Sequence, residues 1–440
     1  MPGSLTIVGL GPGDPGLRTV DAQRALDRAE RIILRTAIHP GIDDLVADRR
    51  TTTCDDLYDQ ESSFEDVYQG VVDRVRTAAE SAHVVYAVPG HPLFGERTVA
   101  LLLERSGDAT IPTTVCAAVS AFDAVSVALG VDSMAEEVQI LDATTLDAWL
   151  RREPFGGGLL DIAPSRPILV TQVYSREVAS SVKLALSRIY ADDHQIRVVI
   201  AAGVGGEESV VSCPLHELDR LPVNHLTSVW VPALPLLQAT RSVATLHHIA
   251  AILRSPEGCP WDRKQSHQSL RTAAIEEAHE VVDAIDEGDS DHLAEELGDL
   301  LLQVALHAQI AEEAGEFTIE DVYDHINRKL VRRHPHVFAD VEAATAEDVV
   351  QTWQGIKAEE RRSNGKPNPA SHPFDRLPRS MPALTRVAHL LESSAMQAPA
   401  QATDDLGDRL LDAVEVLVRA GLDPERELEL AFRRRTVALV

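Results

Sequence analysis

Two clusters of carboxylates at helical spacing lie within residues 276–299. Glu277 and Glu280 are three residues apart, as are Glu296 and Asp299, and residues three apart share one face of a helix. Apolar residues fall between the acids, so the acids border a stripe that packs against a neighbour. Crowded carboxylates repel one another unless a cation neutralises them, and oxygen ligands suit Mg²⁺, with Mn²⁺ as an alternative. The spacing therefore predicts a divalent-metal site.

The elements that must position these acids are two helices joined by a short turn. Residues Glu287 to Asp291 interrupt the apolar periodicity and contain Gly288, which predicts the turn of a helical hairpin with Asp291 as the N-cap of its second helix. At ~1.5 Å per residue, Glu280 lies about 10 Å before the turn and Glu296 about 7.5 Å after it. The two acidic pairs are therefore expected to face one another at similar height.

Composition bounds the class of protein. The chain has 440 residues, whereas a domain typically has ~100–200, so two or three domains are expected. A net charge of −28 argues against nucleic-acid and membrane partners, so local Arg and Lys clusters or a metal must hold any anionic substrate. The 4 cysteines form no CxxC pair, which indicates neither a zinc site nor a disulfide framework. The sequence shows neither a signal peptide nor a long apolar run, which favours a soluble, cytoplasmic protein.

Strand-like and helix-like runs alternate up to about residue 235 and then give way to helices alone. The strand-like runs are residues 5–10, 31–35, 84–88, 167–174, 197–203 and 226–231, and the helix-like runs are 20–29 and 64–79. This alternation predicts an α/β domain with a largely parallel sheet. The proline pair Pro232 and Pro235 marks the boundary, after which the pattern predicts an all-α domain.

The end of the chain carries a partial internal repeat. A stretch around 361–380 is rich in Pro, Asn and Ser, which is typical of a linker. Beyond it, residues 404–435 echo residues 295–333 but lack a preceding EExxE helix. The repeat is therefore expected to be scaffold or dimer surface, not a second active site. The domains expected are 1–238, 239–362 and 363–440.

Two glycine-rich turns follow strands in the first domain. GLGPGDPG (9–16) and VPGHP (88–92) lie where open α/β sheets place ligands, and their amides can cradle one. Together with LRTAIHP (34–40), VSAFDAVSVALGVD (119–132) and HLTSVWVPAL (225–234), they resemble the tetrapyrrole methylase fold in its YabN-like version over nearly all of 1–235. That family binds S-adenosylmethionine between two α/β subdomains. The resemblance implies as cofactor contacts Gly11, Gly13, Asp14, Pro89, Gly90, His91 and Ser120.

A second resemblance covers about a hundred residues of the helical part. GCPWDRKQSHQSL (258–270), the carboxylate hairpin, KLVRRHPHVF (329–338) and WQGIKAEER (353–361) resemble the MazG family of nucleoside triphosphate pyrophosphohydrolases. That resemblance implies Mg²⁺ ligands at Glu277, Glu280, Glu296 and Asp299, with Glu276 adjacent. It implies nucleotide contacts at Lys329, Arg332, Arg333 and Trp353.

The chemistry of that activity agrees with these residue types. Hydrolysis between the α- and β-phosphates needs a metal-activated water and neutralised phosphates. Arg332 and Arg333 offer forked donors to phosphate oxygens, and Lys329 offers a point charge. Glu276 and Glu277 are the candidates for orienting the water. A structural alternative remains for the basic cluster, which is also typical of a solvated helix C-terminus.

Three functions follow from the sequence. The leading hypothesis is a Mg²⁺-dependent hydrolase that converts nucleoside triphosphates to the monophosphate and pyrophosphate. A homodimer or higher homo-oligomer is expected because a short hairpin cannot enclose a nucleotide alone. The first alternative is an S-adenosylmethionine-dependent methyltransferase of unknown acceptor, with the helical part as an accessory module. The second is a non-enzymatic dimeric scaffold.

Overall fold

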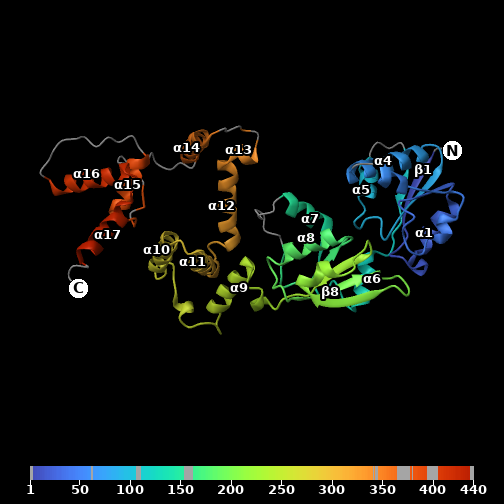
Figure 1. Cartoon of the computed structure of the whole chain (residues 1–440), viewed down its shortest axis with the longest axis horizontal. Helices are drawn as coiled ribbons and strands as arrows, with labels where there is room; N and C mark the ends of the chain where they lie inside the picture. Colours follow the sequence, from blue (N-terminus) through green and yellow to red (C-terminus); the bar gives the residue numbers. More distant parts are fainter. Residues whose placement is uncertain are drawn as a thin grey trace. The chain divides into compact units, whose positions relative to one another are not determined.

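The structure is a computed structural model (Figure 1). It describes residues 3–60, 63–105, 111–152, 162–339, 341, 345–363, 377–378, 380–393 and 405–436. The chain divides into two compact units, Met1–Ile319 and Glu320–Val440, and each is described by itself. Most of the linker predicted around 361–380 lies outside the described residues.

The first sheet is wholly parallel and has the strand order β3-β2-β4-β1-β5. Its strands are β1 (Ser4–Gly9), β2 (Arg31–Leu34), β3 (Thr51–Thr53), β4 (His83–Val88) and β5 (Thr113–Val115). The helical segments around it are η1 (Pro15–Leu17), α1 (Val20–Arg28), α2 (Asp43–Val46), α3 (Asp55–Gln60), α4 (Phe64–Ala79) and α5 (Arg97–Glu104). Strand β4 is a nearly continuous apolar run because helices cover both faces of a central parallel strand.

Separate apolar clusters cover the two faces of this sheet. One joins β1 and β4 to α3, α4 and α5, with Tyr86 and Val71 among its fully buried side chains. The other joins β2 and β4 to α1 and α2 around Leu26 and Ile32. Burial of such side chains stabilises the fold by about 1.5–3 kcal/mol each. The carboxyl ends of the strands are thereby fixed, and the glycine turns follow two of them.

The second sheet is mixed, with the strand order β6-β7-β10-β8-β9. Its strands are β6 (Gln139–Asp142), β7 (Ile168–Thr171), β8 (Gln195–Ile200), β9 (Ser209–Pro214) and β10 (Thr227–Val231). The helical segments near it are α6 (Ala121–Leu129), α7 (Ala143–Arg152), α8 (Arg176–Leu186), η3 (Leu215–Arg220) and η4 (Leu236–Gln238). Only β6 and β7 pair in parallel; β10 is antiparallel to both neighbours, and β8 to β9. Helices α7 and α8 cover one face, and α6 covers Trp230 on the other.

The predicted α/β class is confirmed, and the runs expected to be strands are strands. The alternation correctly predicts β1, β2, β4, β7, β8 and β10, together with α1 and α4. It misses β3, β5, β6 and β9. Strands β3 and β5 have only three residues each, too few for an alternating pattern to be recognised. The alternation predicts one largely parallel sheet, whereas the structure has two five-stranded sheets and the second is mixed. Two α/β subdomains are implied only by the resemblance to the tetrapyrrole methylase fold.

The rest of the first unit is helical, as expected. It comprises α9 (Val243–Arg254), η5 (Asp262–Lys264), α10 (Arg271–Glu287) and α11 (Ser290–Ala314). Helix α9 packs on α11 through a small core that includes Ala250, Leu270 and Leu306. Arg254 closes this core, because its guanidinium donates to the Glu313 carboxylate at 2.8 and 2.7 Å and to the carbonyl oxygen of Gln265 at 3.2 Å. These contacts hold α11, and with it half of the carboxylate hairpin.

The described part of the second unit is also helical. Its helices are α12 (Ile319–Arg333), α13 (Pro335–Phe338), α14 (Ala346–Ser363), α15 (Ala383–Ser393), α16 (Leu406–Arg419) and α17 (Pro424–Thr436). Helices α15, α16 and α17 contact one another. No helix in the described part of either unit is long and apolar enough to span a membrane.

Candidate functional site

Helices α10 and α11 form the predicted hairpin, and short-range caps define its turn. Gly288 ends α10 in the left-handed conformation with φ of 72°, which glycine adopts without steric cost. The Asp289 carboxylate then accepts from the backbone N–H groups of Asp291 and His292 at 3.0 and 3.2 Å. The prediction that Asp291 is the N-cap is therefore wrong. Asp289 has this role, and Asp291 lies in the first turn as one of its donors.

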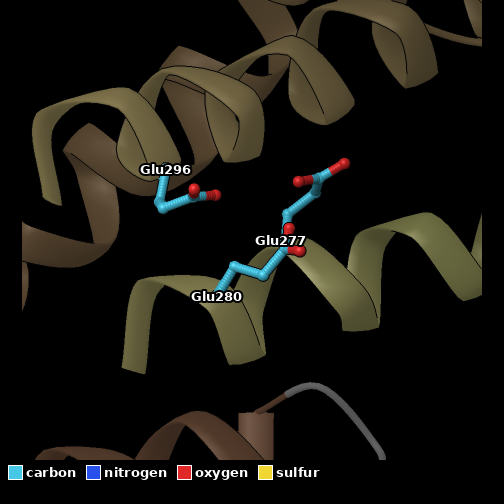
Figure 2. Close-up of side chains that lie close together, drawn as sticks. All are labelled: Glu277, Glu280 and Glu296. Atoms are coloured by element: carbon cyan, nitrogen blue, oxygen red, sulfur yellow. The ribbon is translucent and has the colours of Figure 1, made fainter. Parts of the chain in front are cut away.

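The hairpin brings acidic side chains of both helices together. Carboxylate oxygens of Glu277 and Glu280 on α10 and of Glu296 on α11 all lie within 4.8 Å of one another (Figure 2). Glu277 and Glu296 are half-buried, whereas Glu280 is exposed. Asp299 is not in this group of three, although its charge acts on Glu277. We call Glu277, Glu280 and Glu296 the carboxylate group.

Burial and like charge both oppose ionisation of Glu277. Burial raises the pKa of Glu277 above its usual value, and the charges of Asp299 and Glu280 raise it further. Oxygen ligands at this spacing suit a hard divalent cation such as Mg²⁺ or Mn²⁺, which would neutralise the crowding. Glu276, the other candidate for orienting water, is exposed next to Glu277.

Two side chains that sequence reasoning missed contact this group. Gln303 is 7% exposed, and its amide nitrogen donates to the Glu277 carboxylate at 3.3 Å. The Nε2 atom of His292 lies 3.1 Å from a carboxylate oxygen of Glu296. The pKa of the His292 imidazole is raised, mainly by its hydrogen bond to Glu287. Helical spacing could have found both, because His292 is four residues before Glu296 and Gln303 is seven after it.

Removing one charge from the carboxylate group is expected to stabilise the metal-free protein. The pKa of Glu277 is raised in the folded protein above its unfolded value, near 4.5. This group therefore stabilises the fold at low pH, and that stabilisation is lost as the pH rises through the folded pKa. At pH 7, Glu280→Gln should therefore raise the free energy of unfolding of the first unit by about 0.5 kcal/mol, or ~1–2 °C in melting temperature. Differential scanning calorimetry in chelator measures this shift. The control is Asp283→Asn, which removes an exposed charge from α10 outside the group, and an equal shift in both variants would contradict local crowding.

The predicted phosphate contacts of the second unit are occupied by an internal carboxylate. Glu360 on α14 accepts from the guanidinium of Arg332 at 2.8 Å and from that of Arg333 at 2.6 Å, both on α12. The hydrogen bond from Arg333 is the main cause that lowers the pKa of Glu360 to about 2. Sequence reasoning missed Glu360, and no spacing rule connects residues 28 positions apart on two helices.

The other two predicted nucleotide contacts lie on the same elements. Lys329 is exposed on α12, one turn before Arg333. Trp353 is half-buried on α14, and its ring meets the His334 ring edge-on with centroids 5.6 Å apart. The structure thus gathers the basic pair Arg332 and Arg333 around Glu360 within the second unit, and the carboxylate group within the first.

The two glycine turns of the first sheet contact each other. The backbone N–H of Gly11 donates to the Gly90 carbonyl oxygen at 3.2 Å, and the reverse bond measures 2.9 Å. Both glycines have positive φ, 78° and 64°, which few other residues tolerate. Buried His39, from the LRTAIHP motif, lies with Nε2 3.0 Å from the Gly11 carbonyl oxygen, and burial lowers its pKa to about 4. His39 therefore supports this turn as a neutral imidazole at neutral pH.

The remaining predicted cofactor contacts lie around the same turns, several of them engaged locally. The Asp14 carboxylate accepts from the Gly16 N–H at 2.7 Å and caps η1. The His91 Nδ1 atom accepts from the Leu93 N–H at 3.1 Å, and buried Ser120 caps α6. A Cβ atom at Gly13 would come within 2.6 Å of Val204, beyond β8, so this glycine permits a close approach of the two sheets' loops. Pro89 is half-buried.

The partial repeat uses its acids differently from the hairpin. Its DDLGD segment corresponds to EELGD of α11, so Asp405 corresponds to Glu296. Asp405 is the N-cap of α16 and accepts from the N–H groups of Gly407 and Asp408 at 2.7 and 3.1 Å. Within the described residues, the tail contains no group of three or more possible metal ligands.

Comparison with known proteins finds two families that match different parts of the chain. Residues 4–219 match the family model of tetrapyrrole (corrin/porphyrin) methylases, and residues 265–338 match that of the MazG nucleotide pyrophosphohydrolase domain. The uncharacterized protein YabN of Bacillus subtilis is 41% identical over 393 residues, which are 89% of this chain and 77% of that protein.

Two similar proteins match the helical part alone. The nucleoside triphosphate pyrophosphohydrolase/pyrophosphatase MazG of Thermotoga maritima is 40% identical over 202 residues, 41% of this chain and 78% of that protein. The nucleoside triphosphate pyrophosphohydrolase of Escherichia coli K12 is 44% identical over 144 residues, 32% of this chain and 53% of that protein. These similarities support nucleotide hydrolysis by this part of the chain.

Proposed function

Because the chain belongs to the YabN-like family, in which a tetrapyrrole methylase domain precedes a MazG domain, we propose that it hydrolyses nucleoside triphosphates to the monophosphate and pyrophosphate with Mg²⁺. The carboxylate group carries this proposal. Its oxygen atoms converge within 4.8 Å from two helices, and burial and like charge raise the pKa of Glu277. Such a group is costly without a cation and suits Mg²⁺ with one.

The acids of the hairpin would bind the metal and activate the water in this proposal. Glu277, Glu280, Glu296 and Asp299 hold the metal, which when bound acts as a Lewis acid on water and phosphate oxygens. Glu277, held by Gln303 at 3.3 Å, and its neighbour Glu276 are the candidates for accepting the proton of the attacking water.

The proposed substrate contacts are residues of α12 and α14. Arg332 and Arg333 bind phosphate oxygens with their forked donors, and Lys329 adds a point charge. Trp353 offers its ring to the base. Together these contacts neutralise the phosphates and position the leaving pyrophosphate.

A substrate panel tests the reaction. Purified full-length protein with Mg²⁺ should release pyrophosphate, measured directly, from at least one member of a panel of canonical and base-modified nucleoside triphosphates. Release of inorganic phosphate in its place would mean cleavage at another anhydride bond. Absence of turnover across the panel, with Mn²⁺ as well, would overturn the proposal.

The active form is proposed to be a homodimer or higher homo-oligomer. The hairpin helices leave several large apolar side chains 40–56% exposed, namely Ile275, Val282, Ile285, Leu297, Leu301 and Val304. Such surface beside a charged group is typical of a subunit contact. Light scattering coupled to size-exclusion chromatography should give at least twice the 47.9 kDa of one chain. A strictly monomeric protein with full activity would contradict this part.

Methyl transfer from S-adenosylmethionine is the second candidate, favoured by the paired glycine turns at Gly11 and Gly90. A Cβ atom at Gly90 would meet little but the backbone nitrogen of Ala121, at 3.9 Å, so there is room beside this turn. Calorimetric titration of the full chain with S-adenosylmethionine should show binding. An absence of binding at millimolar cofactor would leave the first domain without this role.

A further inference from the structure

The contact between α12 and α14 pairs the two arginines with an internal carboxylate, that of Glu360. Both guanidinium groups already bind a carboxylate of the same chain. We propose that Glu360 is an internal competitor for the phosphate site, so that incoming phosphate must displace it and departing product is expelled by its return. This inference rests on the proposed function, because it takes Arg332 and Arg333 as phosphate contacts.

The geometry is that of a bound anion. The Oε1 atom of Glu360 accepts from Arg332 Nε at 2.8 Å and from Arg333 Nε at 3.3 Å, while its Oε2 atom accepts from Arg333 Nη2 at 2.6 Å. One carboxylate therefore uses donors of both forks, the same donors that would meet phosphoryl oxygens. A phosphate group and Glu360 cannot occupy these donors together.

Burial and charge add a second argument. The side chains of Glu360 and Arg333 are 15% and 17% exposed, whereas that of Arg332 is 57% exposed. If Glu360 moved away and no other anion took its position, the largely buried guanidinium of Arg333 would be left without this acceptor, and such a loss is costly. The trio retains one net positive charge, so it still attracts anions. An anion that brings two phosphoryl groups can satisfy both forks at once.

The consequence is a phosphate site that is weaker than its two arginines alone would make it. A hydrolase that produces pyrophosphate needs such a limit, because a tight site would retain the product and slow each turnover. Glu360 lowers the affinity of Arg332 and Arg333 for every phosphate anion, because its hydrogen bonds to the two arginines must be broken before the anion binds. Neutralising it should therefore tighten pyrophosphate binding and make product release slower.

Titration with inorganic pyrophosphate tests the inference on the full chain in metal-free buffer. Glu360→Gln keeps the shape of the side chain and one acceptor oxygen but removes the charge, so the Kd for pyrophosphate should fall by about tenfold. Glu359→Gln is the matched control, because it removes the same charge from an exposed neighbour and should change Kd less than twofold. Glu360→Asp, which withdraws the carboxylate by one methylene, should give an intermediate Kd.

Steady-state kinetics separates this inference from the function on which it rests. With a triphosphate that the wild type turns over, Glu360→Gln should show stronger inhibition by added pyrophosphate, by a similar factor. Unchanged or weaker pyrophosphate binding in folded Glu360→Gln, judged by its melting temperature, would overturn the competitor role and leave the hydrolase standing. If Glu360→Gln binds pyrophosphate more tightly but the wild type hydrolyses no triphosphate, the proposed hydrolase activity would be overturned and the competitor role of Glu360 would stand.

Discussion

Glu296→Gln is expected to lower kcat for pyrophosphate release from a triphosphate by at least about 100-fold. Loss of a residue that only supports a metal ligand costs ~10–100-fold, and loss of a ligand itself should cost more. Glu296 is half-buried and is the member of the carboxylate group that α11 supplies. A higher Mg²⁺ concentration should restore little activity, because the neutral amide oxygen of glutamine binds Mg²⁺ more weakly than the charged carboxylate of glutamate.

The neighbouring acid gives a matched control for this variant. Glu295→Gln removes the same charge one residue earlier, from an exposed position on α11, and should retain activity within about twofold. Residues one apart do not share a helix face. Equal losses in the two variants would mean that the net charge of the helix matters and the carboxylate group does not. Full activity in Glu296→Gln would remove the metal site from the proposed mechanism.

Arg333→Ala is expected to raise KM for the triphosphate by about 100-fold, since truncating one partner of a buried charge contact costs ~2–5 kcal/mol. The effect should fall mainly on KM, because in the proposed mechanism this side chain would hold phosphates in both the bound substrate and the transition state. Arg333→Lys should be intermediate, because lysine retains the charge but lacks the fork. Initial rates over a range of substrate concentrations separate the two constants.

A second arginine of α12 serves as the control. Arg328 is 79% exposed and pairs with Asp324 one turn before it, so Arg328→Ala should change KM less than twofold. The double variant Arg333→Ala with Glu360→Gln adds a further check, because a substrate-binding Arg333 and a competing Glu360 predict a partial recovery of KM. An Arg333→Ala protein that is folded and has the wild-type KM would remove the basic pair from the substrate site.

The sequence predicts those parts of the structure that depend on local pattern. The strands β1, β4 and β10 are rich in β-branched and apolar residues, and the hairpin of α10 and α11 follows from acids and apolar residues at helical spacing around Gly288. Helix geometry puts Glu277 and Glu280 on one face of α10, and the short turn at Gly288 brings Glu296 of α11 to a similar height. These features need no knowledge of distant contacts.

Other parts depend on tertiary contacts that local pattern does not encode. The antiparallel pairing of β10 with β7 and β8 depends on the path of the chain through the second sheet. An apolar run in the sequence does not indicate whether its strand is parallel or antiparallel to its neighbours. The pairing of Glu360 with Arg332 and Arg333 joins two helices that are separate along the chain, so no local pattern encodes it. The cap at Asp289 was missed for a different reason, because Asp289, Ser290 and Asp291 all follow Gly288 and each suits the position.

The turn between α10 and α11 sets the phase between the two helices. Each added residue in α11 before Glu296 would rotate that carboxylate by about 100° and shift it by about 1.5 Å. One insertion after Asp289 would thus turn Glu296 away from Glu277 without altering any acid. The length of this turn therefore matters as much to the proposed metal site as the acids that would bind the metal. A protein with every carboxylate in place and one residue too many at this corner should fold as a hairpin and bind no metal.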